Sequence, residues 1–526
     1  MGQAAVLYPI GVETFEKLRE TGCVYVDKTR LVYDVTHTSQ YVFLSRPRRF
    51  GKSLLLTTME SYFQGRKDLF EGLAIDGLET EWRKHPVLLL NLASYNPDVE
   101  DSLEAIISRT FNEWERIYGR RSEETDLSVR FHNIIVSAYE KTGQKVVVLV
   151  DEYDSPLVEN MHNTSKFNFY RNLLKSIYVN LKVCDRYIRF GMLTGVSRFS
   201  KVTVFSGLNN LRDISLLDQY AEICGITETE LETCFNDGIN KLAVTLDTDH
   251  AGALAKLKDN YDGYHFTENC PDIYNPFSVL NALNDSCIRS YWFLSGTPTF
   301  LVRSIQRSGE FLPEMFTEQV DDSQLSQVDI HSTSPLAMMF QTGYLTIKGY
   351  DKRRQLYRLG IPNREVREGL FGDLGSIYLN RQQLKVKKQA LDIRFYLEDG
   401  EVEQAMRCIK SYLAGIPYEL SNGMPEIYFE NNLYILFNLI GIDAHAEWHT
   451  SSGRIDMLLR MPDYIYVMEL KLDGTPREAL EQIGDREYAL QFEHDGRKIV
   501  KIGINFSKET RNIDLSLIHI SEPTRL

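Results

Sequence analysis

A short apolar run, a loop that ends in Gly-Lys-Ser and a second apolar segment follow one another between residues 41 and 60. The first run predicts a strand, and the segment after Ser53 has the composition of a helix. A strand, a tight loop and a helix in this order form a phosphate-binding loop, because backbone N–H groups and the positive end of the helix dipole face the anion. We expect Lys52 to add a positive charge and the Ser53 hydroxyl to ligate Mg²⁺.

The loop departs at one position from the usual pattern G-x-x-x-x-G-K-[ST], because Arg46 stands where the first glycine belongs. The last three residues of the pattern, Gly51, Lys52 and Ser53, are all present. We therefore expect the nucleotide to be bound by Arg49, Phe50, Gly51, Lys52, Ser53 and Leu54. For the side chains of Arg46, Arg48 and Arg49 two alternatives stay open, either contact with phosphate or a partner's nucleotide, or a solvated basic loop, and we favour the solvated loop.

An acidic pair supports the same site about 100 residues after the loop. The run 146–150 is rich in β-branched residues, as in a strand buried on both faces of a parallel sheet, and it ends in Asp151-Glu152. ATPases hold Mg²⁺ and polarise the attacking water with acids at such a strand end. We therefore assign Asp151 to the Mg²⁺ shell opposite Ser53, and Glu152 to the general base.

A third strand candidate, residues 188–193, leads into Thr194, Ser197 and Arg198. In folds of this kind the neighbouring strand end presents polar groups to the γ-phosphate, so we expect Thr194 and Arg198 to contact the nucleotide. Each element alone is a weak signal, since Gly-Lys-Ser occurs by chance and an apolar strand often ends in acids. Their order and spacing together favour a nucleotide site over coincidence.

A second chemical cluster lies near the C-terminus, where residues 453–471 predict two strands joined by a Pro-Asp turn. Glu469 and Lys471 share one face of the second strand. With a loop of two or four residues, Asp456 lies opposite Glu469, about 5 Å away between Cβ atoms, whereas a three-residue loop turns Asp456 to the other face. Two carboxylates on an apolar face repel each other unless a cation lies between them, and Mg²⁺ suits such oxygen ligands.

This arrangement is the D…(D/E)-x-K pattern of restriction-endonuclease-like nucleases, although E-x-K alone also occurs as a surface pair in charged hairpins. We assign Asp456, Glu469 and Lys471 to catalysis, with both carboxylates as Mg²⁺ ligands and Lys471 placed to orient water or stabilise developing charge. The helix that follows supplies Gln482 and Tyr488, polar groups that commonly flank such a site. The helix predicted at 426–440 offers Glu426 or Glu430 as a further acidic ligand.

Both clusters together resemble one family, the bacterial AAA-ATPase-like proteins that carry a C-terminal PD-(D/E)xK nuclease domain. The resemblance rests on residues 9–11 with Phe15, 25–29, 43–53, 150–154, 194–196, 205–210, 274–278 and the hairpin with Asp456, Glu469 and Lys471. The loop with arginine in place of the first glycine is the form that this family has. The resemblance implies ATP binding and a nuclease-like fold.

The whole pattern predicts an α/β protein with a P-loop AAA-like parallel-sheet domain at 1–206 and a helical lid or winged-helix region at 207–290. A linker or middle region at 291–384 and a restriction-endonuclease-like α/β domain at 385–514 follow. Further expected elements are strands at 41–44, 87–92, 146–150 and 188–193, a strand from 345, helices at 103–118 and 167–181, and paired helices at 385–415. We take residues 515–526 to be a non-native tail, because they look like translated sequencing adapter, and assign them no function.

Composition narrows the class of protein further. The seven cysteines include no C-x-x-C pair, which argues against a disulfide framework or a zinc ribbon and fits a reducing compartment. No apolar run is long enough to span a bilayer and residues 1–10 lack a signal-peptide core, so we expect a cytoplasmic protein. The net charge of −14 argues against a generally basic surface but leaves a local basic groove open.

The leading hypothesis is an ATP-dependent, Mg²⁺-dependent nuclease that acts on nucleic acid, with DNA favoured. One alternative is an ATP-driven switch whose C-terminal domain binds nucleic acid or a protein partner without cleaving it. Another is an interaction module whose ATPase part is a structural relic. A homo-oligomer is compatible with the sequence, because ATPases of this kind often need a neighbour's arginine.

Overall fold

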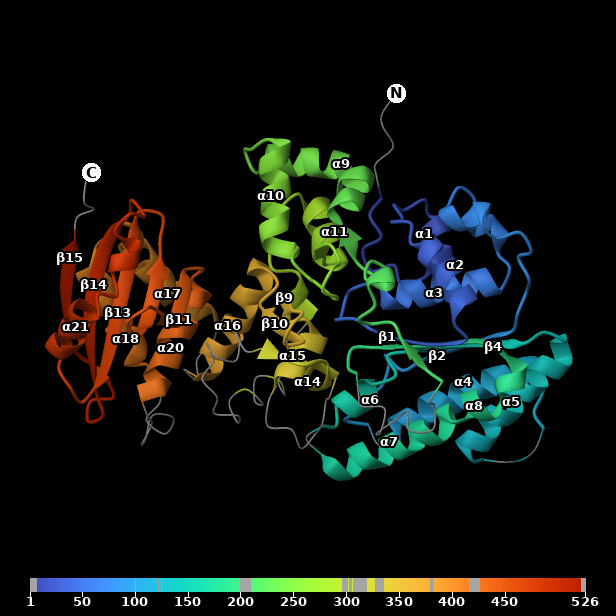
Figure 1. The fold of residues 1–526 in the computed structure, drawn as a ribbon. Coiled ribbons are helices and arrows are strands. Elements are labelled where there is room, and N and C mark those ends of the chain that lie inside the picture. The colour runs from blue at the N-terminus through green and yellow to red at the C-terminus, as the bar shows by residue number, and fades with distance from the viewer. Residues whose placement is uncertain are drawn as a thin grey trace. The chain divides into compact units, whose positions relative to one another are not determined.

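The computed structural model describes residues 7–99, 101–121, 123, 125–161, 163–198, 210–295, 301, 305, 319–326, 335–378, 383–415 and 426–521. The chain forms two compact units, and each is described by itself (Figure 1). The first unit consists of Met1–Leu294 with Gln319–Asn363, and the second of Ser295–Glu318 with Arg364–Leu526. The five-part division made from the sequence is finer than this and stays a prediction.

A parallel sheet of five strands forms the centre of the first unit. Its strands are β1 (Tyr41–Ser45), β2 (Val87–Asn91), β3 (Val146–Asp151), β4 (Ile188–Gly195) and β5 (Arg212–Asp213), in the order β2-β3-β4-β1-β5. β1 and β3 are buried at every position, which is why their sequences are continuous apolar runs rather than alternating ones. The four strands predicted from the sequence are confirmed, whereas the two residues of β5 carry no periodic signal.

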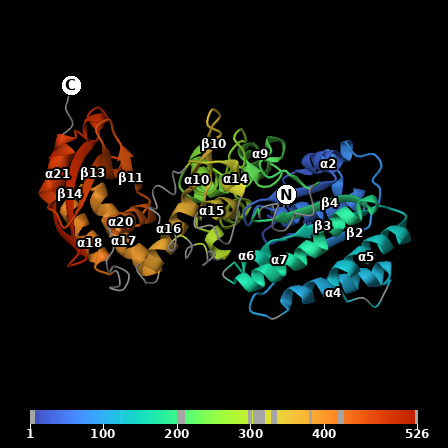
Figure 2. The ribbon, with the colours of Figure 1, turned by 60° about the horizontal axis from the view of Figure 1, so that its bottom comes forward.

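Helices cover both faces of this sheet (Figures 1 and 2). On one side lie α1 (Phe15–Glu20), α2 (Thr29–Thr38) and α3 (Lys52–Phe63), and on the other α4 (Ser102–Tyr118), α5 (Leu127–Thr142), α7 (Thr164–Tyr178) and α8 (Asn180–Val183). The short helix α6 (Ser155–Val158) follows β3. Buried residues of α4 recur at helical spacing, from Leu103 and Ile107 to Phe111 and Trp114, so one stripe of the helix faces the core. The helices predicted at 103–118 and 167–181 are confirmed as α4 and as α7 with α8.

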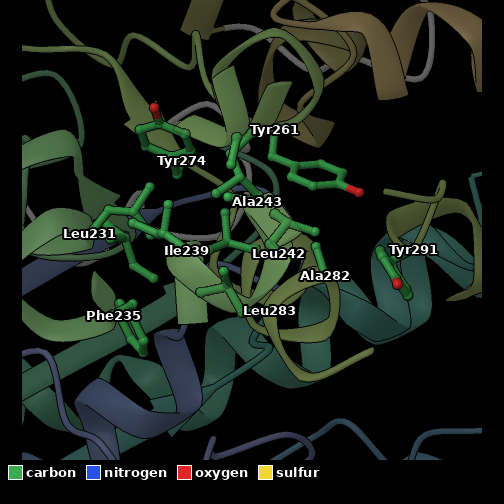
Figure 3. Close-up of a cluster of buried hydrophobic side chains, with 14 residues drawn as sticks. Leu231, Phe235, Ile239, Leu242, Ala243, Tyr261, Tyr274, Ala282, Leu283 and Tyr291 are labelled. Carbon is green, nitrogen blue, oxygen red and sulfur yellow. The ribbon is translucent and has the colours of Figure 1, made fainter. Parts of the chain in front are cut away.

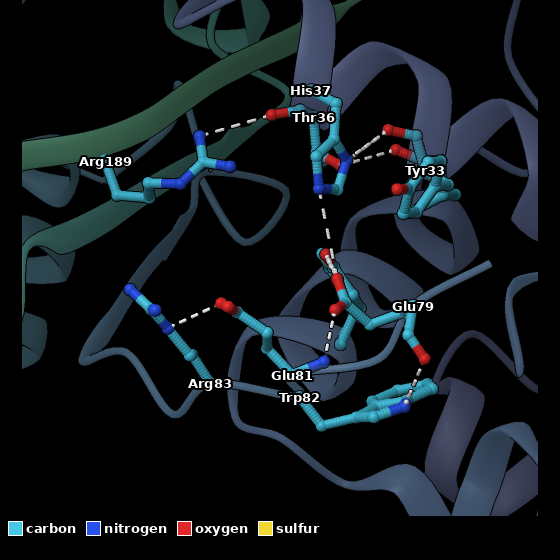
Figure 4. A network of polar contacts seen from close by, with 10 residues as sticks. Tyr33, Thr36, His37, Glu79, Glu81, Trp82, Arg83 and Arg189 are labelled. Atoms are coloured by element: carbon cyan, nitrogen blue, oxygen red, sulfur yellow. Dashed lines mark hydrogen bonds and ion pairs between the residues drawn. The ribbon is translucent and has the colours of Figure 1, made fainter.

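Polar contacts fix the C-terminal half of α2 (Figure 4). Arg189 on β4 donates a hydrogen bond to the carbonyl oxygen of Thr36, at 3.2 Å. His37 lies 3.9 Å from the Glu79 carboxylate, and the indole N–H of Trp82 donates to the Glu79 carbonyl oxygen at 3.1 Å. The first two contacts hold α2 against β4 and against the segment that follows the 3₁₀ helix η2 (Ala74–Gly77).

A small helical region with its own apolar core follows the sheet in the sequence. It contains β6 (Ile226–Thr227), α9 (Glu228–Thr245), α10 (His250–Tyr261), β7 (Ile273–Tyr274) and α11 (Pro276–Asp285). The three helices pack around buried apolar side chains, among them Leu231, Leu242 and Leu283 (Figure 3). The helical character predicted for this region is confirmed.

A short antiparallel sheet of three strands completes the first unit. Helices α14 (Asp322–Ser326) and α15 (Leu336–Thr342) flank it, and its strands β8 (Gln319–Val320), β9 (Thr346–Asp351) and β10 (Leu356–Gly360) pair in the order β8-β10-β9. The strand predicted from residue 345 is confirmed as β9. Gly343 has a φ of +91°, which favours glycine, and so ends α15 shortly before β9.

The second unit combines helices with a mixed sheet. Helices α16 (Arg364–Tyr378), α17 (Gln383–Glu398), α18 (Val402–Leu413) and α20 (Glu426–Leu439) come first. The sheet follows with β11 (Asp443–His449), β12 (Arg454–Arg460), β13 (Tyr464–Leu472), β14 (Lys498–Ser507) and β15 (Asn512–Ser521), paired in sequence order. Only β13 and β14 run parallel, because α21 (Pro476–Asp485) forms the crossover between them. The paired helices predicted at 385–415 and the helix at 426–440 are confirmed.

The turn between β12 and β13 decides which side chains face each other. It has two residues, because the N–H of Met461 donates to the carbonyl oxygen of Tyr464 at 2.8 Å. The ladder pairs Met457 with Met468, so the next step of this register sets Asp456 opposite Glu469. The predicted register is confirmed.

Two further expectations concern the whole chain. Residues 515–521, taken to be non-native, form the second half of β15, antiparallel to β14. An alternating Leu-Ser-Leu-Ile-His-Ile-Ser segment suits a strand whatever its origin, so that origin stays a prediction. Among the described residues, no helix has the length and apolar character needed to cross a membrane.

We expect the variant Thr475→Ala to loosen α21. Thr475 accepts a hydrogen bond from the N–H of Glu478, and the Glu478 carboxylate accepts one from the N–H of Thr475 in return. Loss of this cap costs about 1 kcal/mol. Amide hydrogen exchange in residues 477–485 should quicken by about fivefold, and Thr475→Ser, which keeps the cap, is the control. Equal exchange rates in Thr475→Ala and Thr475→Ser would contradict stabilisation of α21 by the cap.

Candidate nucleotide and metal sites

The order of the parallel strands brings the predicted nucleotide residues together. β1 lies next to β4, and β4 lies next to β3. The carboxyl ends of parallel strands meet at one edge of a sheet, so the loop after β1 faces Thr194 at the end of β4 and Asp151 at the end of β3. Thr194 donates a hydrogen bond to Asp151 at 2.7 Å, which joins two of the predicted residues directly.

The phosphate loop leads into α3 at the predicted residue. Gly51 has a φ of +86° and precedes the first helical residue, Lys52, so this position favours glycine. The Lys52 ammonium is buried and donates to the carbonyl oxygens of Arg46 and Pro47, both at 3.0 Å. Ser53 lies in the first turn of α3, where its N–H group belongs to the helix N-terminus.

Two acids at the end of β3 differ in environment. Asp151 is buried and accepts from Thr194 and from the N–H of Glu152, at 3.0 Å. Glu152 has a left-handed backbone, with a φ of +51°. Burial raises the pKa of Glu152 above its ordinary value, and the charge of Lys52 opposes that shift. A carboxyl group with a raised pKa beside a lysine suits the predicted role of general base.

The loop after β4 is held by a residue that the sequence analysis did not assign to the site. Asp154 is buried and accepts hydrogen bonds from the N–H groups of Val196 and Ser197. Burial raises the pKa of Asp154, and these N–H groups oppose the shift. Arg198 forms an ion pair with Asp213 at 2.9 Å, and its N–H donates to Gln341 at 2.7 Å. Its contact with the nucleotide stays a prediction.

The solvated basic loop favoured for the three arginines is wrong for Arg46. The Arg46 side chain is only 1% exposed and makes its hydrogen bonds within the protein. Arg48 is partly exposed and lies 3.4 Å from Glu159. The Arg49 guanidinium lies over the ring of Phe277, 4.9 Å from its centroid. Burial of Arg46 depends on a segment about 170 residues away, which no local pattern predicts.

An apolar pocket adjoins the phosphate loop and was not predicted. It has a volume of about 90 Å³, and its walls include Gly51 and Leu54 of the loop and α3. The other walls come from separate segments: Pro9, Leu18, 24–26, Lys28, 223–226, Phe235, Pro276 and Leu280. Because these segments are scattered along the chain, only the folded structure assembles the pocket. Its position beside the loop and its apolar lining suit a flat base more than a phosphate.

The predicted carboxylate–lysine group is brought together in the second unit. Glu469 is 1% exposed, and its Oε1 accepts from Lys471 at 3.2 Å and from the amide of Gln482. Asp456 accepts from the N–H of Leu470 at 2.7 Å. Burial and the neighbouring charge of Asp456 both raise the pKa of Glu469 above its ordinary value, while Lys471 opposes the shift. Tyr488, also predicted near the site, is buried in the apolar core beside α21.

Two more carboxylates lie beside Asp456. Ligand oxygens of Glu430, Glu447 and Asp456 lie within 4.8 Å of one another. Glu430 on α20 is one of the two acids that the sequence offered, and the side chain of the other, Glu426, lies outside the described residues. Glu447 was missed. The ladder between β11 and β12 pairs the residues on either side, Ala446 with Met457 and Trp448 with Ile455, and Glu447 itself has a φ of +50°.

This donor set fits a divalent cation. The Oε2 atom of Glu469 is buried and has no hydrogen-bond partner among the described residues. A cation removes both the repulsion between Glu469 and Asp456 and the cost of that unpaired oxygen. All the side-chain donors are carboxylate oxygens, the ligands that Mg²⁺ prefers over thiolates or imidazoles.

Comparisons with known proteins agree with this arrangement. Residues 9–205 match the family model described as "Predicted AAA-ATPase", and residues 424–515 match "PD-(D/E)XK nuclease superfamily". A relative from Azotobacter chroococcum mcd 1, described as "Uncharacterized protein in vnfD 5'region", is 35% identical over 514 residues, 96% of this chain and 97% of the relative. The chain belongs to the family of AAA-ATPase-like proteins with a PD-(D/E)XK nuclease-superfamily domain. The resemblance seen in the sequence is confirmed, and such domains in general use a nucleotide and a divalent metal.

We expect Asp456→Asn to abolish stabilisation by Mg²⁺. The wild-type protein should melt several degrees higher with 10 mM MgCl₂ than with EDTA, because a ligand that binds only the folded state stabilises it. Asp456→Asn should remove that difference, and its metal-free form should melt no lower than the wild type, because the repulsion with Glu469 is relieved. Glu481→Gln on the exposed face of α21 is the matched control. An unchanged Mg²⁺ effect in Asp456→Asn would contradict the assignment.

Proposed function

We propose that this protein binds and hydrolyses ATP in its first unit and cleaves a nucleic-acid phosphodiester, with DNA favoured, in its second unit. The observation that carries the nuclease part is the buried carboxylate of Glu469, which lies beside Asp456 and Lys471 with one oxygen unpaired among the described residues. A surface Glu-Lys pair in a charged hairpin would be exposed to water. Burial of such a pair is costly, and bound metal at a reaction site supplies the compensation.

In the first unit each residue has a distinct role. Backbone N–H groups from Arg49 to Leu54 would hold the phosphates at the start of α3, with Lys52 as the cation. Ser53 and Asp151 would hold Mg²⁺, and Glu152 would take the proton from the attacking water. The contacts of Thr194 with Asp151 and of Arg198 with Asp213 support a sensing role for the β4 end. The apolar pocket beside Gly51 is the proposed place of the base.

In the second unit Asp456 and Glu469 would hold Mg²⁺, and Glu430 and Glu447 lie close enough to Asp456 to add ligands. A bound Mg²⁺ supplies charge neutralisation at the phosphate and a more acidic water. Lys471 would orient that water or stabilise the charge that develops on the phosphate. Gln482 holds Glu469 in place through its amide, as outer partners of metal ligands commonly do.

We further propose that the protein acts in the cytoplasm. The seven cysteines are all unpaired, and no described helix is suited to cross a membrane, which supports that proposal. We also propose that an arginine from a second copy of the protein completes the ATPase site.

We expect Lys52→Ala to lower ATP hydrolysis by at least about 100-fold, the loss typical when one donor to a reacting oxyanion is removed. Phosphate release from MgATP is the measurement. Lys67→Ala, at an exposed position of the same unit, is the control. If Lys52→Ala keeps full Mg²⁺-dependent DNA cleavage, ATP has no part in the nuclease mechanism. Full ATP hydrolysis in this variant would contradict the proposed nucleotide site.

We expect Glu469→Ala to lower DNA cleavage by about 10-fold to 100-fold or more, because loss of a direct ligand costs no less than loss of an outer partner. Wild type and variant are assayed on DNA and on RNA, with and without ATP, MgCl₂ and MnCl₂. Glu481→Ala is the control. Unchanged cleavage by Glu469→Ala would refute the metal assignment. If the wild type binds DNA but cleaves nothing with either metal, the alternative of a non-cleaving ATP-driven switch is favoured.

A further inference from the structure

Arg46 occupies the position at which the usual phosphate loop has its first glycine, and its side chain is among the largest fully buried ones in the described structure. Its backbone does not need a glycine, since Arg46 is absent from the described residues with positive φ. A buried guanidinium is costly unless its donors are satisfied. Its surroundings therefore indicate what the residue does.

Within the described part of the chain, each hydrogen bond of this guanidinium goes to a backbone carbonyl oxygen. Nη1 donates to Ser45 and to Ser215, both at 2.9 Å. Nη2 donates to Tyr220 at 3.1 Å and more weakly to Ala221 at 3.4 Å. The planar fork of arginine reaches several carbonyl groups at once, which the single ammonium of a lysine does not.

The face of the guanidinium is covered by an aromatic ring. The Arg46 Cζ atom lies 4.1 Å from the centroid of the Phe266 ring, a cation–π contact. Burial lowers the pKa of Arg46 to about 10, so it stays charged at neutral pH. The side chain thus ties β1 to two segments that are distant in sequence, the turn 215–221 and the segment around Phe266.

Neighbouring loop residues pack on the same side of the first unit. Phe50 contacts Tyr264 and Phe266 edge-on, with ring centroids 4.8 and 5.4 Å apart. Pro47 lies so close to Gly343 that a Cβ atom on Gly343 would be 2.7 Å from the Pro47 Cβ atom. Side chains from distant segments therefore fix the conformation of this phosphate loop. In a glycine-rich loop the backbone freedom of the glycines sets the conformation instead.

The turn that Arg46 binds also leads directly into the apolar pocket. Tyr220 and Ala221 accept its hydrogen bonds, and residues 223–226 form one wall of that pocket. Movement of the turn would therefore move both the phosphate loop and the pocket wall. A misplacement of about 1 Å at such a site costs up to about 100-fold.

We propose that Arg46 is a positioning residue that fixes the phosphate loop and the wall of the base pocket relative to each other through its carbonyl contacts. This proposal rests on the proposed binding of ATP in the first unit. In the usual motif the first glycine lets the loop take its shape, and here the contacts of Arg46 would do so. Arg46 itself touches neither phosphate nor base.

Two substitutions show whether nucleotide binding depends on the fork geometry of Arg46 or only on its charge. Arg46→Lys keeps the charge and loses the fork, and Arg46→Met keeps the apolar stem and loses both. We expect each to raise the Kd and the KM for MgATP by about 10-fold to 100-fold, with the kcat of Arg46→Lys within about threefold of wild type. Calorimetry and steady-state hydrolysis are the measurements. Leu174→Ala, a buried substitution in α7, is the control that lowers the Tm but leaves Kd unchanged.

A third variant guards against failure of the first two to fold. Phe266→Leu removes the ring over Arg46 and its edge-on contact with Phe50, while every residue of the loop is kept. It should raise Kd by about threefold. Wild-type affinity in Arg46→Lys would mean that charge alone suffices, and wild-type affinity in Arg46→Met or Phe266→Leu would mean that the contacts are dispensable. Either result overturns the positioning role while ATP binding stands. A wild-type protein that binds no nucleotide instead overturns the proposed function itself.

Discussion

The first unit depends on the parallel pairing of β1 with β4 and of β4 with β3. That pairing places the ends of three strands side by side, so that Lys52, Thr194 and Asp151 come together although 142 residues separate the first two. The Thr194–Asp151 hydrogen bond then holds two strand ends in a fixed relation. Without this strand order each motif would be an isolated strand end. The strand order of the sheet thus places the candidate nucleotide residues, and the surrounding helices bury the sheet.

In the second unit the corresponding constraint is a register. The two-residue turn after Met461 aligns Asp456 with Glu469, and the neighbouring strand β11 brings the Glu447 carboxylate within 4.8 Å of Asp456. Three carboxylates therefore stand in one row across three strands, and like charges in such a row destabilise the sheet unless they are compensated. Arg454 forms an ion pair with Glu447 at 2.9 Å, but Lys471 and Gln482 compensate only one oxygen of Glu469. The remaining electrostatic cost is what makes a divalent cation the natural occupant of this group.

Features with a local or periodic cause were predictable. Buried parallel strands are continuous apolar runs, so β1, β3 and β4 could be located, and the turn length limited the hairpin to two registers. Contacts between distant segments were not predictable. Arg46 was expected in solvent, but its partners lie in the turn 215–221 and at Phe266. Glu447 was missed because one glutamate in a strand has no signal until its neighbours are known, and the pocket beside Gly51 combines walls from scattered segments.

By itself the sequence determined which chemical groups this protein carries at its two candidate sites. Gly-Lys-Ser before a helix, Asp-Glu after a buried strand and Asp…Glu-x-Lys in a hairpin each specify a local geometry, since hydrogen bonding and side-chain alternation act over a few residues. Only the tertiary structure decided how these groups are supported. It buried Arg46 against carbonyl oxygens, paired Arg198 with Asp213 and set Glu430 and Glu447 beside Asp456. Those contacts join residues far apart along the chain, and burial of their charges is favourable only when the whole fold supplies the partners.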